Sequence, residues 1–199
     1  DEFRGNPNIR TAMSKRGIAS INRAIDQEII DAADGSSTAL TASTDGASNQ
    51  AAALSTLARV SHWMSFLLEA DVPADDNELW AVISVKASLQ IQRIAEFKSA
   101  DYVDYKPMPN APGSRVLRWQ GVNWLTHNGL TGKGTAACRM YMFHKSALGH
   151  MVSGEPAPHM FDSEEDDYFG VRYDVMHAAK TCLPRGIVSF YHDDTAALA

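Results

Sequence analysis

Cysteine is scarce in this chain, and long hydrophobic runs are absent from it. Only 2 of the 199 residues are Cys. Cys138 lies in an apolar run and Cys182 stands beside Leu183 and Pro184, so two buried, reduced thiols are expected. No stretch approaches the roughly 18 apolar residues of a membrane-spanning helix, so we expect no contact with a membrane. No charged segment followed by an apolar one opens the chain, so no secretory signal is predicted.

Basic residues are outnumbered by acidic ones. The chain has 18 Lys and Arg against 24 Asp and Glu, which gives a net charge of −6 and a pI of about 5.6. This balance argues against tight, salt-sensitive binding of nucleic acid as the main role. Hydrophobic residues make up 45% of the chain, which is enough to build the core of one domain or of two small lobes.

Sequence motifs that carry catalysis are absent or incomplete. Gly129–Thr135 resembles part of a phosphate-binding loop, but it lacks the spacer, and Gly134 stands where Ser or Thr should follow Lys133. A flexible hairpin loop is the simpler interpretation. There is no Gly-x-Ser-x-Gly turn, and Ser146 and Ser189 have no evident catalytic partner in the sequence.

Patterns typical of metal sites are missing as well. The 7 histidines include no His-x-x-x-His pair, and no Cys-x-x-Cys appears. The acidic run Asp162–Asp167 lacks the spacing of a calcium loop and is expected to be a solvated loop. His192, Asp193 and Asp194 follow a strand near a tail of small residues, where frayed surface charge is expected. We therefore assign no catalytic, metal-binding or cofactor-binding residue, and we expect no cofactor and no enzymatic activity.

The most distinctive local pattern predicts a long helix from Pro7 to Asp34. Asn6 can cap this helix, Pro7 suits its first position, and Gly35 can end it. A single apolar stripe recurs along it at spacings of three and four residues: Ile18, Ile21, Ile25, Ile29 and Ala32. A helix of this span would be about 40 Å long, and its narrow stripe predicts that it lies across a surface. Residues 35–50 are small and polar and are expected to form a loop.

The remaining chain predicts helices first and strands afterwards, which indicates the α+β class. Further helices are expected from Leu54 to Leu68 and near Lys86–Phe97, and a short helical turn at Lys145–Met151. Lys106–Gly113 is expected to be a proline-rich loop. Strands are expected at Leu79–Ile83, Val116–Trp119, Val122–Leu125, Ala136–Phe143, Val171–Val175 continuing toward Cys182, and Gly186–His192.

Several short patterns follow one another in a recognisable order. The helix ends in the segment Asn22–Gly35, and the later patterns are Glu69–Pro73, Leu79–Val85, Trp119–Trp124, Tyr141–Gly149, Tyr168–Ala179 and Pro184–Val188. This order resembles the major capsid proteins of tailed bacteriophages, in which a spine helix carries a similar arginine, aspartate, isoleucine-pair and glycine pattern. The resemblance implies the Hong Kong 97 fold. That fold has a peripheral lobe with the long spine helix and long strands, and an axial lobe with a mixed sheet flanked by helices.

The resemblance also implies a division of this chain. Residues 1–48 would form the peripheral lobe with the spine helix and the following loop, and residues 49–150 the axial lobe. Residues 151–182 would supply the peripheral strands, and residues 183–199 the final axial strand and the tail. Family members carry an N-terminal arm and an extended loop before the spine helix. Because this chain starts at the helix, we expect either that those parts have been cleaved or omitted or that the chain is a core fragment.

A structural role follows from the same resemblance. Copies of the chain would build the hexamers and pentamers of an icosahedral shell in a virion, after synthesis in the bacterial cytoplasm. Scaffolding and portal proteins are expected partners, and packaged double-stranded DNA would be contacted weakly and without specificity. Contact surfaces are expected on the exposed face of the helix Pro7–Asp34, including Arg16 and Arg23, on the loop Pro107–Pro112, and on the strands near Tyr168–Tyr173.

Two alternatives to a phage shell remain at this stage. The first is the shell protein of a bacterial nanocompartment, which has the same fold and encloses enzymes instead of DNA. The second is a small α+β enzyme whose metal site is assembled from dispersed residues such as His144, His177 and Asp174.

Overall fold

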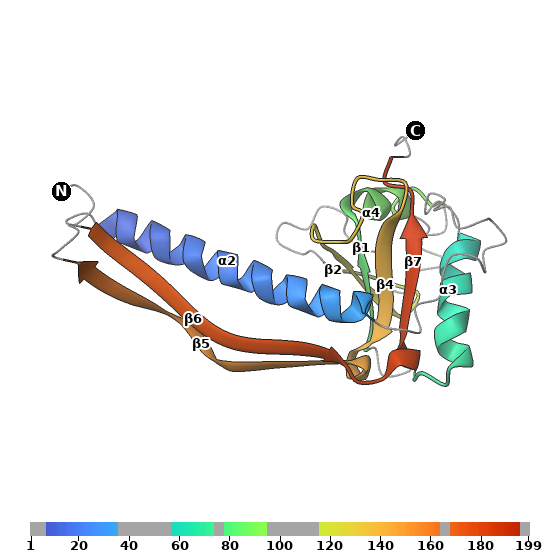
Figure 1. Cartoon of the computed structure of the whole chain (residues 1–199). Helices are drawn as coiled ribbons and strands as arrows, with labels where there is room; N and C mark the ends of the chain where they lie inside the picture. Colours follow the sequence, from blue (N-terminus) through green and yellow to red (C-terminus); the bar gives the residue numbers. More distant parts are fainter. Residues whose placement is uncertain (1–6, 36–56, 74–77, 95–115, 164–167, 196–199) are drawn as a thin grey trace. The chain divides into compact units, whose positions relative to one another are not determined.

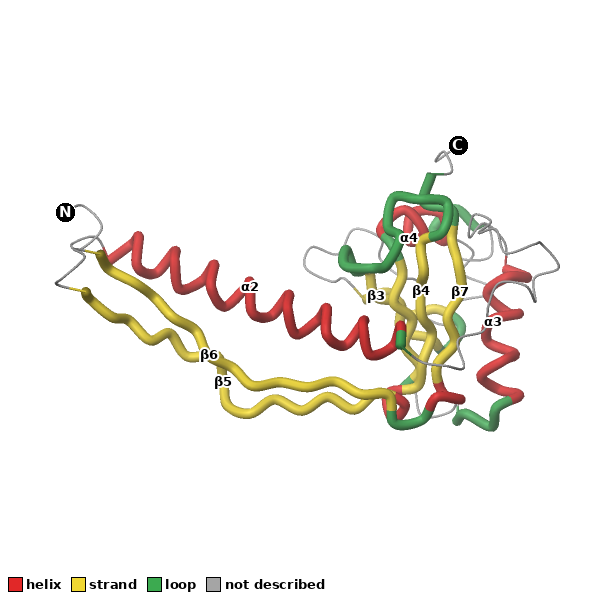
Figure 2. Tube along the Cα trace, viewed as in Figure 1, coloured by secondary structure: helices red, strands yellow, loops and turns green. Residues whose placement is uncertain are grey.

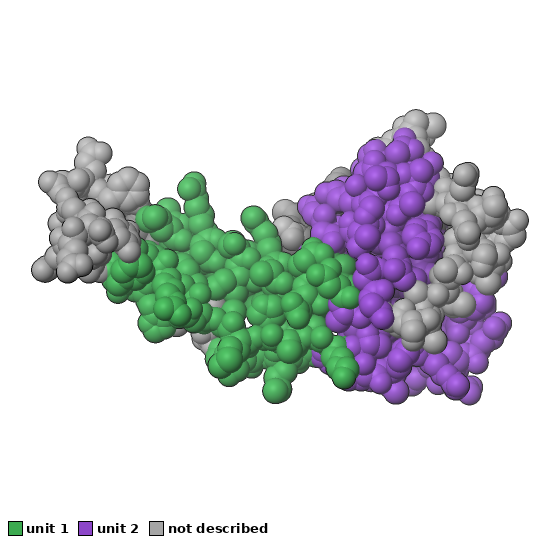
Figure 3. Space-filling model, in the orientation of Figure 1, with its two compact units in different colours: residues 1–31, 150–180 green, residues 32–149, 181–199 purple. Residues whose placement is uncertain are grey.

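The chain divides into two compact units, which are coloured separately in Figure 3. The computed structural model describes residues 7–35, 57–73, 78–94, 116–163 and 168–195. Unit 1 comprises Asp1–Asp31 and His150–Lys180, and unit 2 comprises Ala32–Gly149 and Thr181–Ala199. Both units combine helix with strand, so the predicted α+β class is confirmed. None of the described helices combines the length and the apolar character needed to cross a membrane.

Unit 1 consists of a long helix that lies along a two-stranded ribbon (Figure 1). The helix α2 (Pro7–Asp34) has 28 residues and the predicted bounds, and Gly35 follows it in a turn. The strands β5 (Leu148–Ser163) and β6 (Tyr168–Thr181) pair only with each other among the described strands. A two-stranded sheet is marginally stable by itself, so the helix that covers it contributes to its stability.

Helix and ribbon approach closely at Gly17 of α2 and Tyr173 of β6. A Cβ atom built at Gly17 would overlap the ring of Tyr173, so this approach requires glycine. The odd-numbered residues of β6 from Val171 to Ala179 are half-buried, whereas the even-numbered ones from Arg172 to Lys180 are exposed. This is the alternation of a strand with one covered face, as the sequence predicted.

Unit 2 is built on a five-stranded mixed sheet (Figure 2). Its strands are β1 (Leu79–Ile83), β2 (Val116–Trp119), β3 (Val122–Thr126), β4 (Cys138–His144) and β7 (Ile187–His192). Their order is β2-β3-β1-β4-β7, with β1 parallel to β3 and antiparallel to β4. Gln120 and Gly121 join β2 to β3 with φ of 50° and 73°, the left-handed values that a tight two-residue hairpin turn requires.

Two helices and a set of large apolar side chains complete unit 2. The helix α3 (Leu57–Glu69) packs against β7, where the ring of Trp63 stacks on Phe190 with centroids 3.7 Å apart. The helix α4 (Val85–Ile91) begins where β1 ends. The 3₁₀ turns η2 (Lys145–Ala147) and η3 (Pro184–Gly186) precede β5 and β7. The largest fully buried side chains include Trp124, Tyr141, Leu67 and Ile187.

Some local predictions are wrong. The segment after β3 is not a hairpin loop, because β1 lies between β3 and β4 in the sheet and the connection must pass the end of β1. The helical turn predicted at Lys145–Met151 stops at Ala147, and a 16-residue strand begins at Leu148. Cys138 is buried as expected, but Cys182 is exposed. That thiol lies in the short connection between β6 and η3 rather than inside the core.

Other predictions fall outside the described residues and stay predictions. They concern Asn6 as a cap, the loop after Gly35, the proline-rich loop Lys106–Gly113, and most of the acidic run Asp162–Asp167. The helix predicted near Lys86–Phe97 is shorter than expected, because α4 ends at Ile91 and residues 92–94 form a turn and a bend.

Candidate functional site

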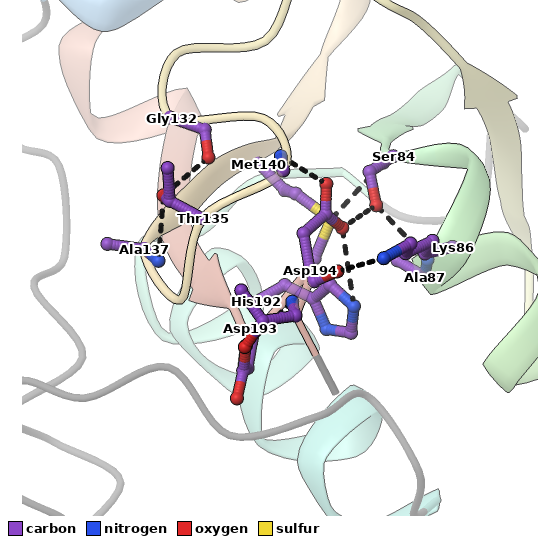
Figure 4. Close-up of polar contacts among 12 residues, drawn as sticks. Ser84, Lys86, Ala87, Gly132, Thr135, Ala137, Met140, His192, Asp193 and Asp194 are labelled. Carbon is purple, nitrogen blue, oxygen red and sulfur yellow. Dashed lines mark hydrogen bonds and ion pairs between the residues drawn. The ribbon is translucent and has the colours of Figure 1, made fainter. Parts of the chain in front are cut away.

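A buried polar cluster lies at the end of the sheet in unit 2, around Asp194 (Figure 4). Ser84 Oγ, which follows β1, donates a 2.5 Å hydrogen bond to Asp194 Oδ1. The backbone N–H of Gly134 donates to Asp194 Oδ2 at 3.0 Å, and the N–H of Asp194 donates to the carbonyl of Thr135 at 3.0 Å. Lys86 Nζ donates to the carbonyl of Asp194 at 2.5 Å. Through these hydrogen bonds, the side chain and backbone of Asp194 connect the segment between β3 and β4 to the start of α4.

His192 and Cys138 complete this cluster. His192 Nε2 lies 3.6 Å from Asp194 Oδ1. Burial, the charge of Asp194 and a hydrogen bond to its carboxylate together raise the pKa of the Cys138 thiol to about 12, with burial the largest cause. The thiol is therefore protonated at neutral pH and acts as a donor to Asp194. His192 and Cys138 have no exposed surface, and Asp194 is 2% exposed, so the expectation of frayed surface charge at residues 192–194 is wrong for His192 and Asp194.

Serine, histidine and aspartate occur together here, but their arrangement does not activate a nucleophile. In a catalytic triad the histidine accepts the proton of the serine and the aspartate orients the histidine. In this cluster Asp194 lies between the other two, and Ser84 Oγ donates to Asp194 rather than to His192. Ser84 Oγ also accepts the N–H of Ala87 at 3.1 Å, which caps α4. The cluster is a buried structural network, in which Asp194 accepts the hydrogen bonds of Ser84 and Gly134.

A second polar cluster holds the last turn of α2 to the sheet within unit 2. Asp34 accepts hydrogen bonds from Arg139 Nη1, from Tyr141 Oη at 2.7 Å and from Thr131 Oγ1 at 3.2 Å. A negative charge at the C-terminal end of a helix is unfavourable, and the guanidinium of Arg139 offsets it. Burial raises the pKa of Tyr141 well above its usual range, and the hydrogen bond and charge of Asp34 add to this shift. Arg139 Nη2 also donates to Ser189 Oγ at 3.2 Å, a partner that the sequence did not indicate.

The residues of the dispersed metal site do not assemble within either unit. His144 belongs to unit 2, where its Nδ1 lies 2.7 Å from Ser146 Oγ. Asp174 and His177 belong to β6 of unit 1, and they lie on its opposite faces because Asp174 is exposed and His177 is half-buried. No group of three or more His, Cys, Asp or Glu able to hold a metal occurs in the part of the chain that the structure describes.

Five large apolar side chains along the ribbon of unit 1 are exposed. We call this set the ribbon surface: Met151 (73% exposed), Val152 (40%), Met160 (48%), Phe161 (43%) and Met176 (76%). Contact sites between proteins commonly include exposed apolar side chains. Three of the five are methionines, whose flexible side chains adapt to a partner surface. The residue pattern did not indicate this surface on β5, because only the family resemblance placed strands before Val171 in residues 151–182.

The charged residues expected at contact surfaces are also accessible. Arg16 and Arg23 are both exposed, and they lie about two turns apart on the same face of α2. Arg172 and Asp174 form an exposed ion pair at 2.9 Å on β6. The loop Pro107–Pro112 lies outside the described residues.

Comparison with solved structures defines the fold. The chain is similar to a chain of Mycobacterium phage Che8, with 19% identity and a TM-score of 0.67 over 90% of this chain and 62% of that one. It is similar to the capsid of the Cyanophage P-SCSP1u, with 13% identity and a TM-score of 0.53 over 98% of this chain and 69% of that one. It is also similar to the capsid of an empty GTA particle, with 14% identity and a TM-score of 0.58 over 96% and 69%. The predicted Hong Kong 97-type capsid fold is confirmed.

The family follows from the sequence itself. The chain belongs to the phage capsid protein family, whose model matches residues 1–194. No match is found by sequence among curated proteins. The chain spans 62% of the length of the Che8 chain that it resembles.

Proposed function

We propose that this chain is a major capsid protein, which self-assembles into the hexamers and pentamers of an icosahedral phage or prophage shell. The observation that carries the proposal is the match of the phage capsid protein family to residues 1–194. The fold is shared with chains described as capsids of a cyanophage and of an empty GTA particle, which supports the same role. On this proposal the protein has a structural task in the virion and no enzymatic one.

The two compact units support the division into lobes. In this proposal residues 1–48 and 151–182 form the peripheral lobe, and residues 49–150 and 183–199 form the axial lobe. Unit 1 is made of residues 1–31 and 150–180, and it contains the long helix and the long strands that a peripheral lobe would have. Unit 2 contains the mixed sheet with its helices, which is the composition of an axial lobe.

The contact surfaces of the proposed shell are the ribbon surface and the outward face of α2. The large exposure of Met151 and Met176 supports this assignment, because burying such side chains against another copy would release apolar surface from water. Arg16 and Arg23 are exposed and free to face acidic groups of a neighbouring copy in a shell built from an acidic chain. Interfaces of this kind need large complementary surfaces rather than reactive groups.

The remaining partners are part of the same proposal. Scaffolding and portal proteins would guide assembly in the bacterial cytoplasm, and the finished shell would enclose double-stranded DNA. The net charge of −6 supports a weak, non-specific contact with that DNA, because an acidic surface repels the phosphate backbone.

Analysis of particle contents tests this role against a nanocompartment shell. Particles purified from cells that produce the chain with its natural partners would be treated with nuclease, opened, and analysed for nucleic acid and for protein. We expect nuclease-protected double-stranded DNA. Particles that hold an enzyme and no DNA would overturn the phage role in favour of a nanocompartment. Protein that forms no particles with its natural partners would overturn the shell role itself.

A further inference from the structure

Two histidines face each other across the strands of the ribbon in unit 1. His150 lies on β5 and His177 on β6, and their ring centroids are 6.4 Å apart with an angle of 57° between the ring planes. His150 is exposed, so the site is open to solvent. His177 is half-buried, and its Nδ1 is buried and has no hydrogen-bond partner among the described residues. A buried ring nitrogen without a partner is unusual, because such atoms are normally satisfied.

The two rings lie near the separation that a shared metal ion requires. Imidazole nitrogens bind Zn²⁺ at about 2.0–2.1 Å, so two histidines at the tetrahedral angle on one ion have ring centroids ~5 Å apart. The observed 6.4 Å is about 1 Å longer, so binding requires a rotation of the exposed His150 side chain toward His177. Imidazole is a preferred ligand of zinc, copper and nickel, whereas magnesium and calcium prefer oxygen.

We propose that His150 and His177 form a two-histidine site for a divalent late transition metal such as Zn²⁺. No third protein ligand is assigned, since the described residues hold no larger cluster of metal-binding side chains. Water would fill the remaining positions on the side of the exposed His150. Neither the family match nor the proposed shell role implies this site.

The position of the site gives the ion a mechanical role. A metal bound by both strands cross-links β5 to β6, which otherwise pair only with each other among the described strands. It binds the paired ribbon and not the separated strands, so it stabilises unit 1 by mass action. His150 is the first residue of unit 1 on β5, so the cross-link lies where that strand enters the unit.

Titration of the full chain with Zn²⁺ at pH 7.5 tests the proposal. The protein is first dialysed against a chelator and then against metal-free buffer, and binding is followed by calorimetry. The variants are His150→Gln and His177→Gln, with His159→Gln as the matched control, because His159 is an exposed histidine on the same strand β5. Of the two site variants, His150→Gln is the one expected to keep the native fold, since an exposed side chain can be replaced without disturbing it.

The expected result is one site per chain, with at least tenfold weaker affinity in His150→Gln and in His177→Gln and unchanged affinity in His159→Gln. Zn²⁺ should also raise the midpoint of thermal unfolding of the original chain and not that of the two site variants. Equal affinity in all four proteins, or no binding by the original chain, would overturn the proposal.

Discussion

Ser84 Oγ donates a 2.5 Å hydrogen bond to Asp194 Oδ1 across 110 positions of the sequence. This bond connects the segment after β1 to the segment after β7, the two ends of the part of the chain that builds the sheet of unit 2. The same carboxylate binds the N–H of Gly134 and lies 3.6 Å from His192 Nε2. Asp194 therefore holds together the segments that pack at this end of the sheet.

Replacement of Asp194 by alanine should destabilise unit 2 by about 2–4 kcal/mol, because Ser84, Gly134 and His192 would lose a buried partner. Denaturant unfolding followed by tryptophan fluorescence measures this change. Asp193→Ala is the matched control: Asp193 accepts its bonds locally from Thr195, so its loss should cost well under half as much. Equal effects of the two variants would contradict the role assigned to Asp194.

The two cysteines should differ sharply in reactivity. Cys138 is buried with a pKa raised to about 12, whereas Cys182 is exposed. A thiol reagent at pH 8 should modify one cysteine of the native protein rapidly, and peptide mapping should place the label on Cys182. Both should react once the protein is unfolded. Fast labelling of Cys138 in the native protein would show that the cluster around Asp194 is open to solvent.

Stability should fall at alkaline pH because of the same thiol. Its pKa is raised on folding from 9.0 to about 12, so the folded state retains a proton that the unfolded state loses. The contribution of the protonated Cys138 thiol to the free energy of unfolding is fully present below pH 9. It is lost as the pH rises toward 12, at up to about 1.4 kcal/mol per pH unit. Tyr141, whose pKa is also raised, adds to this loss at the upper end of the window.

The variant Cys138→Ala removes the titrating group and tests this alkaline effect. The free energy of unfolding, measured by urea titration at several pH values, should decline less steeply above pH 9 than in the original chain. Cys182→Ala serves as the control, since that thiol is exposed, and its pH profile should match the original. Parallel profiles for all three proteins would contradict the assignment.

Replacement of Gly17 by alanine should destabilise the protein, although Gly17 lies inside the helix α2. Glycine to alanine normally stabilises the interior of a helix by ~1 kcal/mol, but a Cβ here would overlap the ring of Tyr173. We expect Gly17→Ala to cost roughly 1–3 kcal/mol through this overlap. Asn22→Ala, at an exposed position of the same helix, should be neutral or slightly stabilising.

A second substitution tests whether the overlap of the new Cβ atom with the Tyr173 ring causes the loss of stability in Gly17→Ala. Combining it with Tyr173→Leu removes the ring atoms that the new Cβ would meet, so thermal unfolding followed by circular dichroism should show recovery of part of the loss. A double variant that is no more stable than expected from the two single changes would mean that the ring is not the obstacle.

Charge reversal on the outward face of α2 should weaken assembly and leave the fold intact. Arg16 and Arg23 are exposed, so the double variant Arg16→Glu/Arg23→Glu should keep the circular dichroism spectrum and the unfolding midpoint of the original chain. Sedimentation should show fewer or no large particles. Lys15→Glu is the control, because Lys15 is exposed on the same helix but lies on a different face from the two arginines. Normal assembly of the double variant would remove this face of α2 from the interfaces.

Elements with a clear local pattern were predictable from the sequence. The stripe from Ile18 to Ile29 and the flanking Pro7 and Gly35 define α2, and apolar runs between turn residues define β1 and β3. The residue pattern did not predict β5, because its segment contains glycine, two prolines and acidic residues, which weaken any local preference for a strand. Only the family resemblance, which assigned strands to residues 151–182, placed a strand before Val171. The segment is a strand because β6, which begins at Tyr168, pairs with it, and the pattern of the segment by itself does not reveal that pairing.

The burial of the cluster around Asp194 was not predictable for a related reason. His192, Asp193 and Asp194 are polar residues before a tail of small ones, which by composition indicates a surface. The segment is buried because the connection between β3 and β4 and the start of α4 enclose it, and both are brought there by the sheet. The ring contact of His150 with His177 likewise arises from strand pairing and leaves no trace in sequence spacing.

The most direct test of the proposed shell role is the mass of the purified protein in solution. Light scattering with negative-stain microscopy would be applied to this chain and to any longer natural form of it, over a range of protein and salt concentrations. The account predicts rings of five or six copies, or closed shells, from at least one form. Strict monomers of both forms under every condition would contradict it.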